Sequence, residues 1–419
     1  MTPDGGPVTP DGGPAGAGSL RLLGANRPFR LLWTARTVSF AGDSLGLVAL
    51  MLHVAETTGQ ALAVALLLLA GDFVPALFGP LAGTLADRVD RRRVMVGCEL
   101  VQSALVVAIA LWLPSLPLLL VLVGLRAAAA QVFQPASRAA VPAVVPGRDL
   151  ERANAAVGLG TNGGEALGPL LAAVALPVLG VRGVLLVDGA TFLVSAALLG
   201  FLPAMPGAGP GRDRRASFLA DARTGLRYLW DRPLVRAVAL GYVAIVACNG
   251  IDDVALVFLA TDTLGGGAGA VGLLLAAVGI GLLAGYALLA RARGGAPMTA
   301  LLLAGFAVSS AGNLLTGLAW AVAAAFAVQA VRGLGVAAMD VAATTLVQRN
   351  VPQHLLGRVF GTLYGGIGVA AAFAYLLGGL LLDRTTPRVA LIAAGSAGLV
   401  VAMVTALALR RSGGGEPSP

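Results

Sequence analysis

The chain has 419 residues, of which 57% are hydrophobic and only 12% are charged, and its mean hydropathy is +0.86. Soluble domains carry about 25% charged residues because their surfaces face water, so a soluble enzyme and a disordered chain are both excluded. The net charge is +8, but these charges are too dilute for a nucleic-acid-binding face. The remaining class is a protein that crosses the membrane several times.

Residues 1–28 predict a disordered tail. A TPDGGP hexapeptide occurs there twice, at residues 2–7 and 9–14. Sequence this rich in proline and glycine cannot bury a core, and it lacks the apolar region of a cleaved signal peptide. We therefore expect the first membrane helix to act as an uncleaved insertion signal.

Twelve apolar segments are long enough to span a bilayer, which takes about 20 residues in a helix. The shortest divisions are the turns at 113–116 and 318–320, and joining the helices there would leave ten spans. The predicted spans are Phe29–Ala55, Ala61–Leu85, Val94–Leu113, Leu116–Phe133, Asn154–Leu176, Gly183–Leu202, Val235–Ala260, Ala268–Ala290, Met298–Leu318, Trp320–Leu346, Val359–Leu382 and Val389–Leu409.

The arginines predict the orientation of these spans. With a cytoplasmic amino terminus, the outer loops hold only Arg182, Arg384 and Arg388, and most of the other arginines fall on the cytoplasmic side. This asymmetry follows the positive-inside rule. We expect a multi-pass protein of the plasma (inner) membrane with both termini in the cytoplasm.

The spans predict a division into five parts. Residues 1–28 form the cytoplasmic tail, 29–203 an N-terminal six-helix bundle, 204–234 a cytoplasmic linker, 235–410 a C-terminal six-helix bundle and 411–419 a second tail. Apolar residues within 218–229 recur at helical spacing. This pattern indicates an amphipathic helix on the inner membrane surface, or equally a solvated helix that joins the bundles.

The two halves resemble each other in sequence. A shift of 206 residues places Arg126 on Arg332, and it also places the Val-Pro pair at 145–146 on the pair at 351–352. Each half has an even number of spans, so both enter the membrane from the same side. A parallel repeat of this kind encloses a cavity between its halves, which predicts an all-α membrane protein with two pseudo-symmetric bundles and transport by alternating access.

Between the second and third spans lies the segment GPLAGTLADRVDRRR, residues 79–93. Its Gly83, Asp87, Arg88 and Arg91 match the loop signature of the major facilitator superfamily, which the chain resembles, and Arg92 extends the basic cluster. Asp90 stands where the family has a second glycine. The resemblance implies that this loop is a conformational switch in which Asp87 meets the inner start of span eleven. The arginines of this loop also contribute to the cytoplasmic excess of positive charge that orients the spans.

Other segments narrow the resemblance. Arg126 matches the arginine of the family's fourth-helix motif, and Gly164, Gly168 and Pro169 match the core of its antiporter motif. The segments FRLLWTARTVSFAGDSLG and QPASRAAVPAVVPGRDLERANA are similar to the branch that contains enterobactin exporters and macrolide-type efflux pumps. This likeness implies export, and the glycines alone equally fit ordinary close helix packing.

Ionisable residues inside the spans are the candidates for ion coupling, because a charge in hydrocarbon needs a partner or a cavity. Asp43 lies near mid-depth, on the same helix face as Arg36, and Asp188 and Asp252 lie toward the outer side. Asp43 is the first candidate proton carrier and Glu165 the second. The full set is Asp43, Glu165, Asp188, Arg36 and Arg126, with Arg332, Asn249 and Asp252 as cavity candidates of the second half. The alternative is structural pairing of these acids with arginine, which we favour for Asp72 and Asp340.

The sequence therefore predicts a proton-coupled exporter of a hydrophobic or amphiphilic small molecule, drug-like or siderophore-like. The alternatives are an uptake transporter of a metabolite or lipid, and a membrane sensor without transport. There is no phosphate-binding GxxxxGK[ST] sequence, so we expect neither an ATPase subunit nor an enzyme. We expect a monomer whose partners are the lipid bilayer, the substrate and protons, with no nucleic acid, cofactor or metal.

Overall fold

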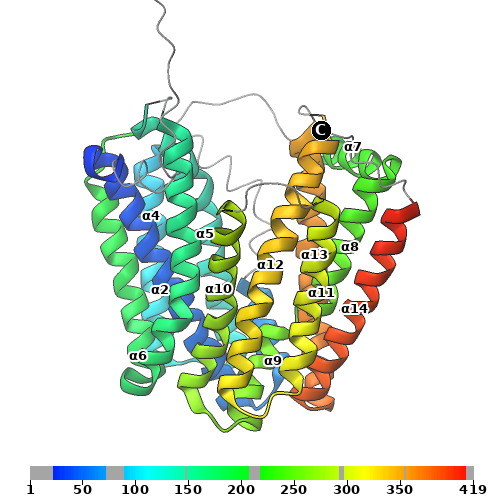
Figure 1. Cartoon of the computed structure of the whole chain (residues 1–419). Helices are drawn as coiled ribbons and strands as arrows, with labels where there is room; N and C mark the ends of the chain where they lie inside the picture. Colours follow the sequence, from blue (N-terminus) through cyan, green and yellow to red (C-terminus); the bar gives the residue numbers. More distant parts are fainter. Residues whose placement is uncertain are drawn as a thin grey trace, which may run out of the picture.

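In the computed structural model of the chain, residues 22–71, 89–146, 149–206, 218–291, 297–352 and 355–411 are described (Figure 1). Nearly all of these residues are helical. The first half contains α2 (Arg27–Thr58), the Ala61–Gly71 helix, α4 (Arg91–Trp112), α5 (Leu116–Val144) and α6 (Leu150–Gly200). The second contains α7 (Phe218–Asp231), α8 (Pro233–Asn249), α9 (Asp252–Phe258), the π-helix η2 (Leu259–Thr263), α10 (Gly267–Arg291), α11 (Met298–Gly317), α12 (Val322–Asn350), α13 (Leu356–Arg384) and α14 (Pro387–Arg411).

These helices agree with the predicted twelve-span membrane fold. In the described part of the chain, ten helices are long and apolar enough to cross a membrane, and the shorter Ala61–Gly71 helix begins the predicted second span. The long α6 covers two predicted spans and has a left-handed break at Gly180, where φ is 63°. Glycine adopts this backbone conformation without strain. The two short turns predicted at 113–116 and 318–320 are both present, because α4 ends before α5 begins and α11 ends before α12 begins.

The seventh span is not the continuous helix that the sequence predicts. The α-helix α8 ends at Asn249, a new α-helix starts at Asp252, and its last turn widens into the π-helix η2. At Gly250 an added Cβ would lie 2.9 Å from the Cβ of Ala374. The chain therefore passes α13 too closely for a side chain here, and the break places Asp252 in the first turn of α9.

The two halves share an apolar core at one end only. This core contains Leu50 and Leu176 from the first half and Val257 and Leu391 from the second. The other three cores of the described residues each lie within one half. The shared core lies at the predicted outer end, where α2 ends at Thr58. Among the described residues, the halves are thus closed at the predicted outer end and have separate cores at the predicted inner end.

Two close helix crossings join the halves, and we call them the outer seam: Gly272 against α6, and Gly379 with Asp383 against the Ala61–Gly71 helix. A Cβ on Gly272 would lie 2.5 Å from the backbone nitrogen of Ala173, and one on Gly379 would lie 2.8 Å from the Cα of Leu62. The Asp383 carboxylate accepts hydrogen bonds from the backbone N–H groups of Ala61 (2.6 Å) and Leu62 (3.2 Å). It caps a helix of the opposite half, where a negative charge is favoured.

The predicted linker helix is present as α7 and packs on the second half. A Cβ on Gly225 would lie 2.4 Å from the carbonyl oxygen of Arg358, and Leu229 is buried. Leu226 and Trp230 are 53% and 58% exposed and lie one turn apart on a different face. The helix, which lies at one end of the second half (Figure 1), therefore docks on α13 through one face and leaves Leu226 and Trp230 exposed on another. Its contact with a membrane surface stays a prediction.

Candidate functional site

An ion pair joins the first and fourth spans of the first half. Arg126 on α5 contacts Asp43 on α2 through its Nη1 atom. The Arg126 side chain is 8% exposed, whereas the Asp43 side chain is 36% exposed. The cation is therefore enclosed by protein, and the acid that pairs with it can be reached from outside the protein interior.

A second acid, Asp188 on α6, lies near this pair. It is 2% exposed, its charge interacts with Arg126, and its Oδ1 atom has no hydrogen-bond partner among the described residues. A Cβ on Gly46 would lie 2.2 Å from the Asp188 Oδ2 atom, so only glycine lets the acid reach α2 here. Gly46 follows Asp43 by one helical turn. Asp188 thus meets α2 about one turn from Asp43 in the direction of the predicted outer end, and its predicted place toward the outer side stays a prediction.

Arg36 points toward the same helix as Asp43 but has other partners. Its Nη1 atom donates to the Ser137 hydroxyl on α5, and its guanidinium lies 5.6 Å from the ring centre of Phe40. Arg36 is buried, with 5% of its surface exposed. Arg36 and Asp43 therefore both point toward α5, as their predicted shared helix face requires. Arg36 contacts Ser137 there, whereas Asp43 contacts Arg126.

Glu99 on α4 is a buried acid that sequence reasoning did not single out. It is 0% exposed, and its two carboxylate oxygens accept hydrogen bonds from Ser39 on α2 (3.2 Å) and Ser195 on α6 (2.9 Å). The residue thus ties three spans together. Its position as the single acid of the predicted third span was the signal that could have identified it.

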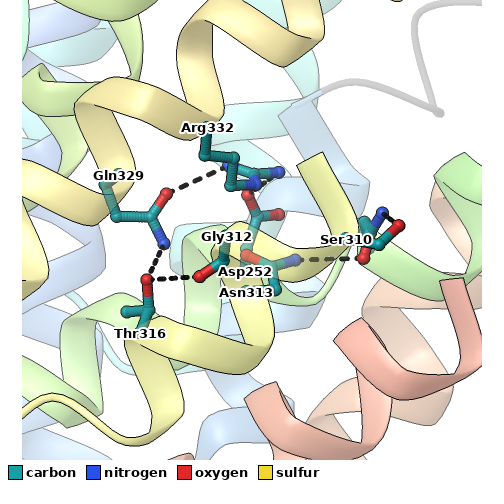
Figure 2. A network of polar contacts seen from close by, with 8 residues as sticks. Asp252, Ser310, Gly312, Asn313, Thr316, Gln329 and Arg332 are labelled. Atoms are coloured by element: carbon teal, nitrogen blue, oxygen red, sulfur yellow. Dashed lines mark hydrogen bonds and ion pairs between the residues drawn. The ribbon is translucent and has the colours of Figure 1, made fainter. Parts of the chain in front are cut away.

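The second half holds a corresponding ion pair. Arg332 on α12 contacts Asp252 on α9 at 2.5 Å, and both side chains are nearly covered, with 7% and 9% exposed (Figure 2). The Arg332 Nη1 atom also donates to the Gln329 amide oxygen at 3.3 Å. The Gln329 amide nitrogen in turn donates to the Thr316 hydroxyl at 3.1 Å, which anchors this side of the pair to α11.

Neutral amides and hydroxyls extend this polar region. Asn249, at the end of α8, donates to the Ser310 hydroxyl at 3.1 Å and accepts from the Asn313 amide at 3.2 Å. All three residues are at most 4% exposed. The predicted candidates Arg332 and Asp252 lie beside Asn313 of α11 (Figure 2), and the third candidate, Asn249 of α8, joins this buried region through its hydrogen bonds to Ser310 and Asn313.

The two ion pairs are related by the sequence repeat. The shift that places Arg126 on Arg332 also places Asp43 on Asn249, and Asp252 follows Asn249 by three residues. Each half thus pairs the arginine of its fourth span with an aspartate of its first span. In the second half the acid has moved by about one helical turn, and an amide occupies the original position.

The start of α4 shows what the aspartate at position 90 does. Asp90 is the N-cap of the helix, and its carboxylate accepts from the backbone N–H groups of Arg93 (3.0 Å) and Met205 (2.8 Å). It therefore satisfies two backbone donors at this end of the bundle. Where the family has a glycine, this chain has an aspartate that caps α4 and binds the segment after α6.

Two residues of the loop motif lie in α4 and bind carbonyl groups. Arg91 donates to the carbonyl oxygen of Ala139 at 3.4 Å, and Arg92 donates to that of Leu202 at 2.8 Å. Both arginines thus fasten α4 to neighbouring helices of the first half. The other residues predicted for this switch, Gly83, Asp87 and Arg88, lie outside the described residues.

The glycines of the antiporter motif lie at the contact of α6 with α2. A Cβ on Gly164 would lie 3.1 Å from the backbone nitrogen of Ala41, and one on Gly168 would lie 2.3 Å from the Cβ of Ser44. Pro169 lies in α6 beside the outer seam, where its carbonyl oxygen is 2.6 Å from a Cβ built on Gly272. The side chain of Glu165 lies outside the described residues.

The described residues contain no group of three His, Cys, Asp or Glu side chains placed to hold a metal ion. The polar groups of the candidate site are instead arginine–carboxylate pairs, amides and hydroxyls. Such groups can exchange hydrogen-bond partners within a protein interior, and the carboxylates among them can also take up and release protons.

The chain is similar in sequence to several known transport proteins. The chain is 25% identical over 390 residues to an uncharacterized MFS-type transporter, YfiS, of Bacillus subtilis, covering 89% of this chain and 91% of that protein. It is 26% identical over 376 residues to the multidrug efflux pump Tap of Mycolicibacterium fortuitum, covering 85% and 89%. Over 128 residues, 30% of this chain and 32% of the relative, it is 30% identical to macrolide efflux protein A of Streptococcus pyogenes.

A solved nucleoside transporter, NupG, has the same fold, with a TM-score of 0.75 at 11% identity over 91% of this chain and 99% of that one. The sequence model of the Major Facilitator Superfamily matches residues 32–361. That match covers most of the chain, including both arginines of the repeat. The chain is thus a multi-pass membrane transporter that belongs to the major facilitator superfamily.

Proposed function

We propose that this transporter is a proton-coupled exporter of hydrophobic or amphiphilic small molecules, drug-like or siderophore-like, that works as an antiporter by alternating access. Two relatives are named as a macrolide efflux protein and a multidrug efflux pump, which supports export as the direction of transport and drug-like molecules as the cargo. The arginine asymmetry supports a plasma-membrane protein with cytoplasmic termini.

The observation that carries the proposal is the uneven exposure of the Arg126–Asp43 pair. A carboxylate that is 36% exposed can take up a proton, while its partner stays enclosed and charged. Protonation cancels the charge of Asp43 and releases Arg126. The nearby Asp188, with an unpaired Oδ1 atom, is placed to accept that cation. A change of partner between α2 and α6 would couple the proton to a movement of helices.

Alternating access then needs the halves to open at the outer seam. The bonds from Asp383 to the Ala61–Gly71 helix connect the halves and must break for the cavity to face outward. Moving one charge across 100 mV provides about 2.3 kcal/mol, which is comparable to the net worth of a few such hydrogen bonds. One proton per cycle is therefore enough to bias the opening.

Accumulation of ethidium in cells tests the proposal. Cells that produce the protein should retain less ethidium than cells with an empty vector, and a protonophore should remove the difference. Asp43→Asn should behave like the empty vector, while Asp262→Asn, which changes an exposed acid of η2, should behave like the wild type. Higher accumulation with the protein would indicate uptake, and equal accumulation would indicate a sensor; either result contradicts export.

A further inference from the structure

A second acidic position in the second half lies apart from the Arg332–Asp252 pair. Asp340 follows Arg332 by eight residues on α12, which places it about 12 Å closer to the predicted inner end. Its Oδ1 atom accepts from the Tyr242 hydroxyl on α8 at 3.4 Å, and its Oδ2 atom accepts from the Tyr286 hydroxyl on α10 at 2.6 Å. Three different helices therefore bring these three side chains together.

The aromatic surroundings of Asp340 are unusual for this chain. The sequence has only five tyrosines, and two of them bind this one carboxylate. A third, Tyr364 on α13, is close enough to Tyr242 to interact with it electrostatically, and its side chain is 55% exposed. Tyr242 also meets the Phe306 ring edge to face, with ring centres 6.2 Å apart. Three of the chain's five tyrosines thus lie at or near one acid.

Asp340 also differs from Asp252, the other membrane-depth acid of this site region, by its lack of a paired cation. In the described part of the chain, Asp252 forms an ion pair with Arg332, whereas Asp340 forms none with any basic side chain. Asp340, Tyr242 and Tyr286 are all half-buried, so the group is neither sealed in the core nor fully open. A carboxylate at membrane depth normally has a positive partner or a polar cavity.

A carboxylate beside tyrosine rings is the chemistry that recognises an organic cation. The ring faces attract positive charge through their quadrupoles, and the carboxylate attracts it directly. Large lipophilic cations lose little hydration on entering such a site, unlike small metal ions. The site lies on the side of the protein where the described residues of the two halves have separate cores, which would admit a ligand from the predicted cytoplasmic side.

From this geometry we propose that Asp340, Tyr242 and Tyr286 bind the positively charged group of a lipophilic cation, which makes amphiphilic organic cations the cargo class. The inference rests on the proposed export function and specifies its substrate. We call these three residues the cation site. The competing explanation is that Asp340 only ties α8, α10 and α12 together through hydrogen bonds, which a neutral amide can also do.

Binding of radiolabelled tetraphenylphosphonium to the purified protein in nanodiscs tests the cation site. Wild-type protein should bind this permanent cation, and excess unlabelled cation should displace it, whereas the neutral triphenylphosphine oxide should not. Asp340→Asn keeps the side-chain size and an acceptor for the tyrosines but removes the charge. It should weaken binding at least about tenfold, and Tyr286→Phe should weaken it by a smaller factor. Asp262→Asn is the matched control and should bind like the wild type.

The thermal unfolding midpoint of each variant separates recognition from folding. A purely structural tie predicts unchanged cation affinity in Asp340→Asn, whether or not the midpoint falls, and that result would overturn the proposal. Equal affinity of wild-type protein for the cation and the neutral compound would also overturn it. If Asp340→Asn does not fold, the comparison of Tyr286→Phe with the control Tyr375→Phe decides in the same way.

The binding experiment tests the cation site independently of proton-coupled export, because binding is measured without a proton gradient. Failure of proton coupling would leave tetraphenylphosphonium binding intact. A wild-type protein that exports neutral compounds but does not bind the cation would overturn the cation site and leave export standing.

Discussion

The first and second halves of the chain each pair an arginine of the fourth span with an aspartate of the first span, but the two pairs have different surroundings. In the first half the acid is 36% exposed and a second acid, Asp188, lies beside the arginine. In the second half both members are nearly covered, and the arginine is also held by the neutral amide of Gln329. One repeat unit thus produces a partly exposed acid beside its arginine in one half and an enclosed ion pair in the other.

The difference follows from which alternatives each arginine has. Arg126 also interacts electrostatically with a second carboxylate, Asp188 on a different helix, so we expect it to change partner if Asp43 becomes neutral. If Asp252 becomes neutral, the hydrogen bond from Arg332 to the neutral Gln329 amide remains. A buried cation without a counter-charge is costly, so the second pair should stay intact through the cycle while the first changes partner.

The largest effect on stability is expected for Asp252→Asn. Removing one member of an enclosed ion pair leaves Arg332 buried with its charge uncompensated, at a cost of about 3–5 kcal/mol. The thermal unfolding midpoint in detergent should fall sharply. Arg332→Gln together with Asp252→Asn should recover much of the loss. A midpoint like that of the wild type in the single variant would show that the second pair is not fixed.

The first pair should respond differently, and a double variant sharpens the contrast. Asp43→Asn alone should cost no more than about 1 kcal/mol, because the acid is partly exposed and Arg126 can turn to Asp188. Asp43→Asn combined with Asp188→Asn should cost clearly more than the sum of the two single changes, since Arg126 then has no acid nearby. Additive losses in the unfolding midpoints would contradict the change of partner.

A smaller effect is expected at the outer seam, which both halves share. Asp383→Ala removes two hydrogen bonds to the Ala61–Gly71 helix and should favour outward opening by about 1–2 kcal/mol, or roughly tenfold in population. Spin labels at Gln60→Cys and Thr386→Cys, in a background without Cys98 and Cys248, would report this opening as a longer distance. Asp262→Ala is the control. An unchanged distance distribution in Asp383→Ala would show that the Asp383 hydrogen bonds do not hold the outer seam closed.

The sequence predicted the spans because bilayer thickness fixes the length of an apolar helix. The third span, for example, was predicted at Val94–Leu113, and α4 runs from Arg91 to Trp112. The break in the seventh span was missed because the hydropathy of the whole segment stays high, although Asn249, Asp252 and Asp253 flank Gly250. The close approach of α13 to Gly250 is a contact between distant parts of the chain, and the local sequence does not predict it.

The site was harder to predict than the fold. The repeat identified Arg126 and Arg332, because both arginines interrupt apolar spans at equivalent positions. The sequence did not identify which acid meets which partner, since that depends on how helices cross. Glu99 meets serines of two other spans, and Asp188 reaches α2 because Gly46 lacks a side chain.

The most direct test of a movable first pair compares two transport modes in proteoliposomes, using tetraphenylphosphonium as substrate. Asp43→Asn should lose accumulation driven by a proton gradient but keep exchange of labelled for unlabelled substrate, because exchange requires no net proton movement. Wild-type protein should perform both. Gradient-driven accumulation by Asp43→Asn at the wild-type level would contradict the account, because the proton would then be carried by another group.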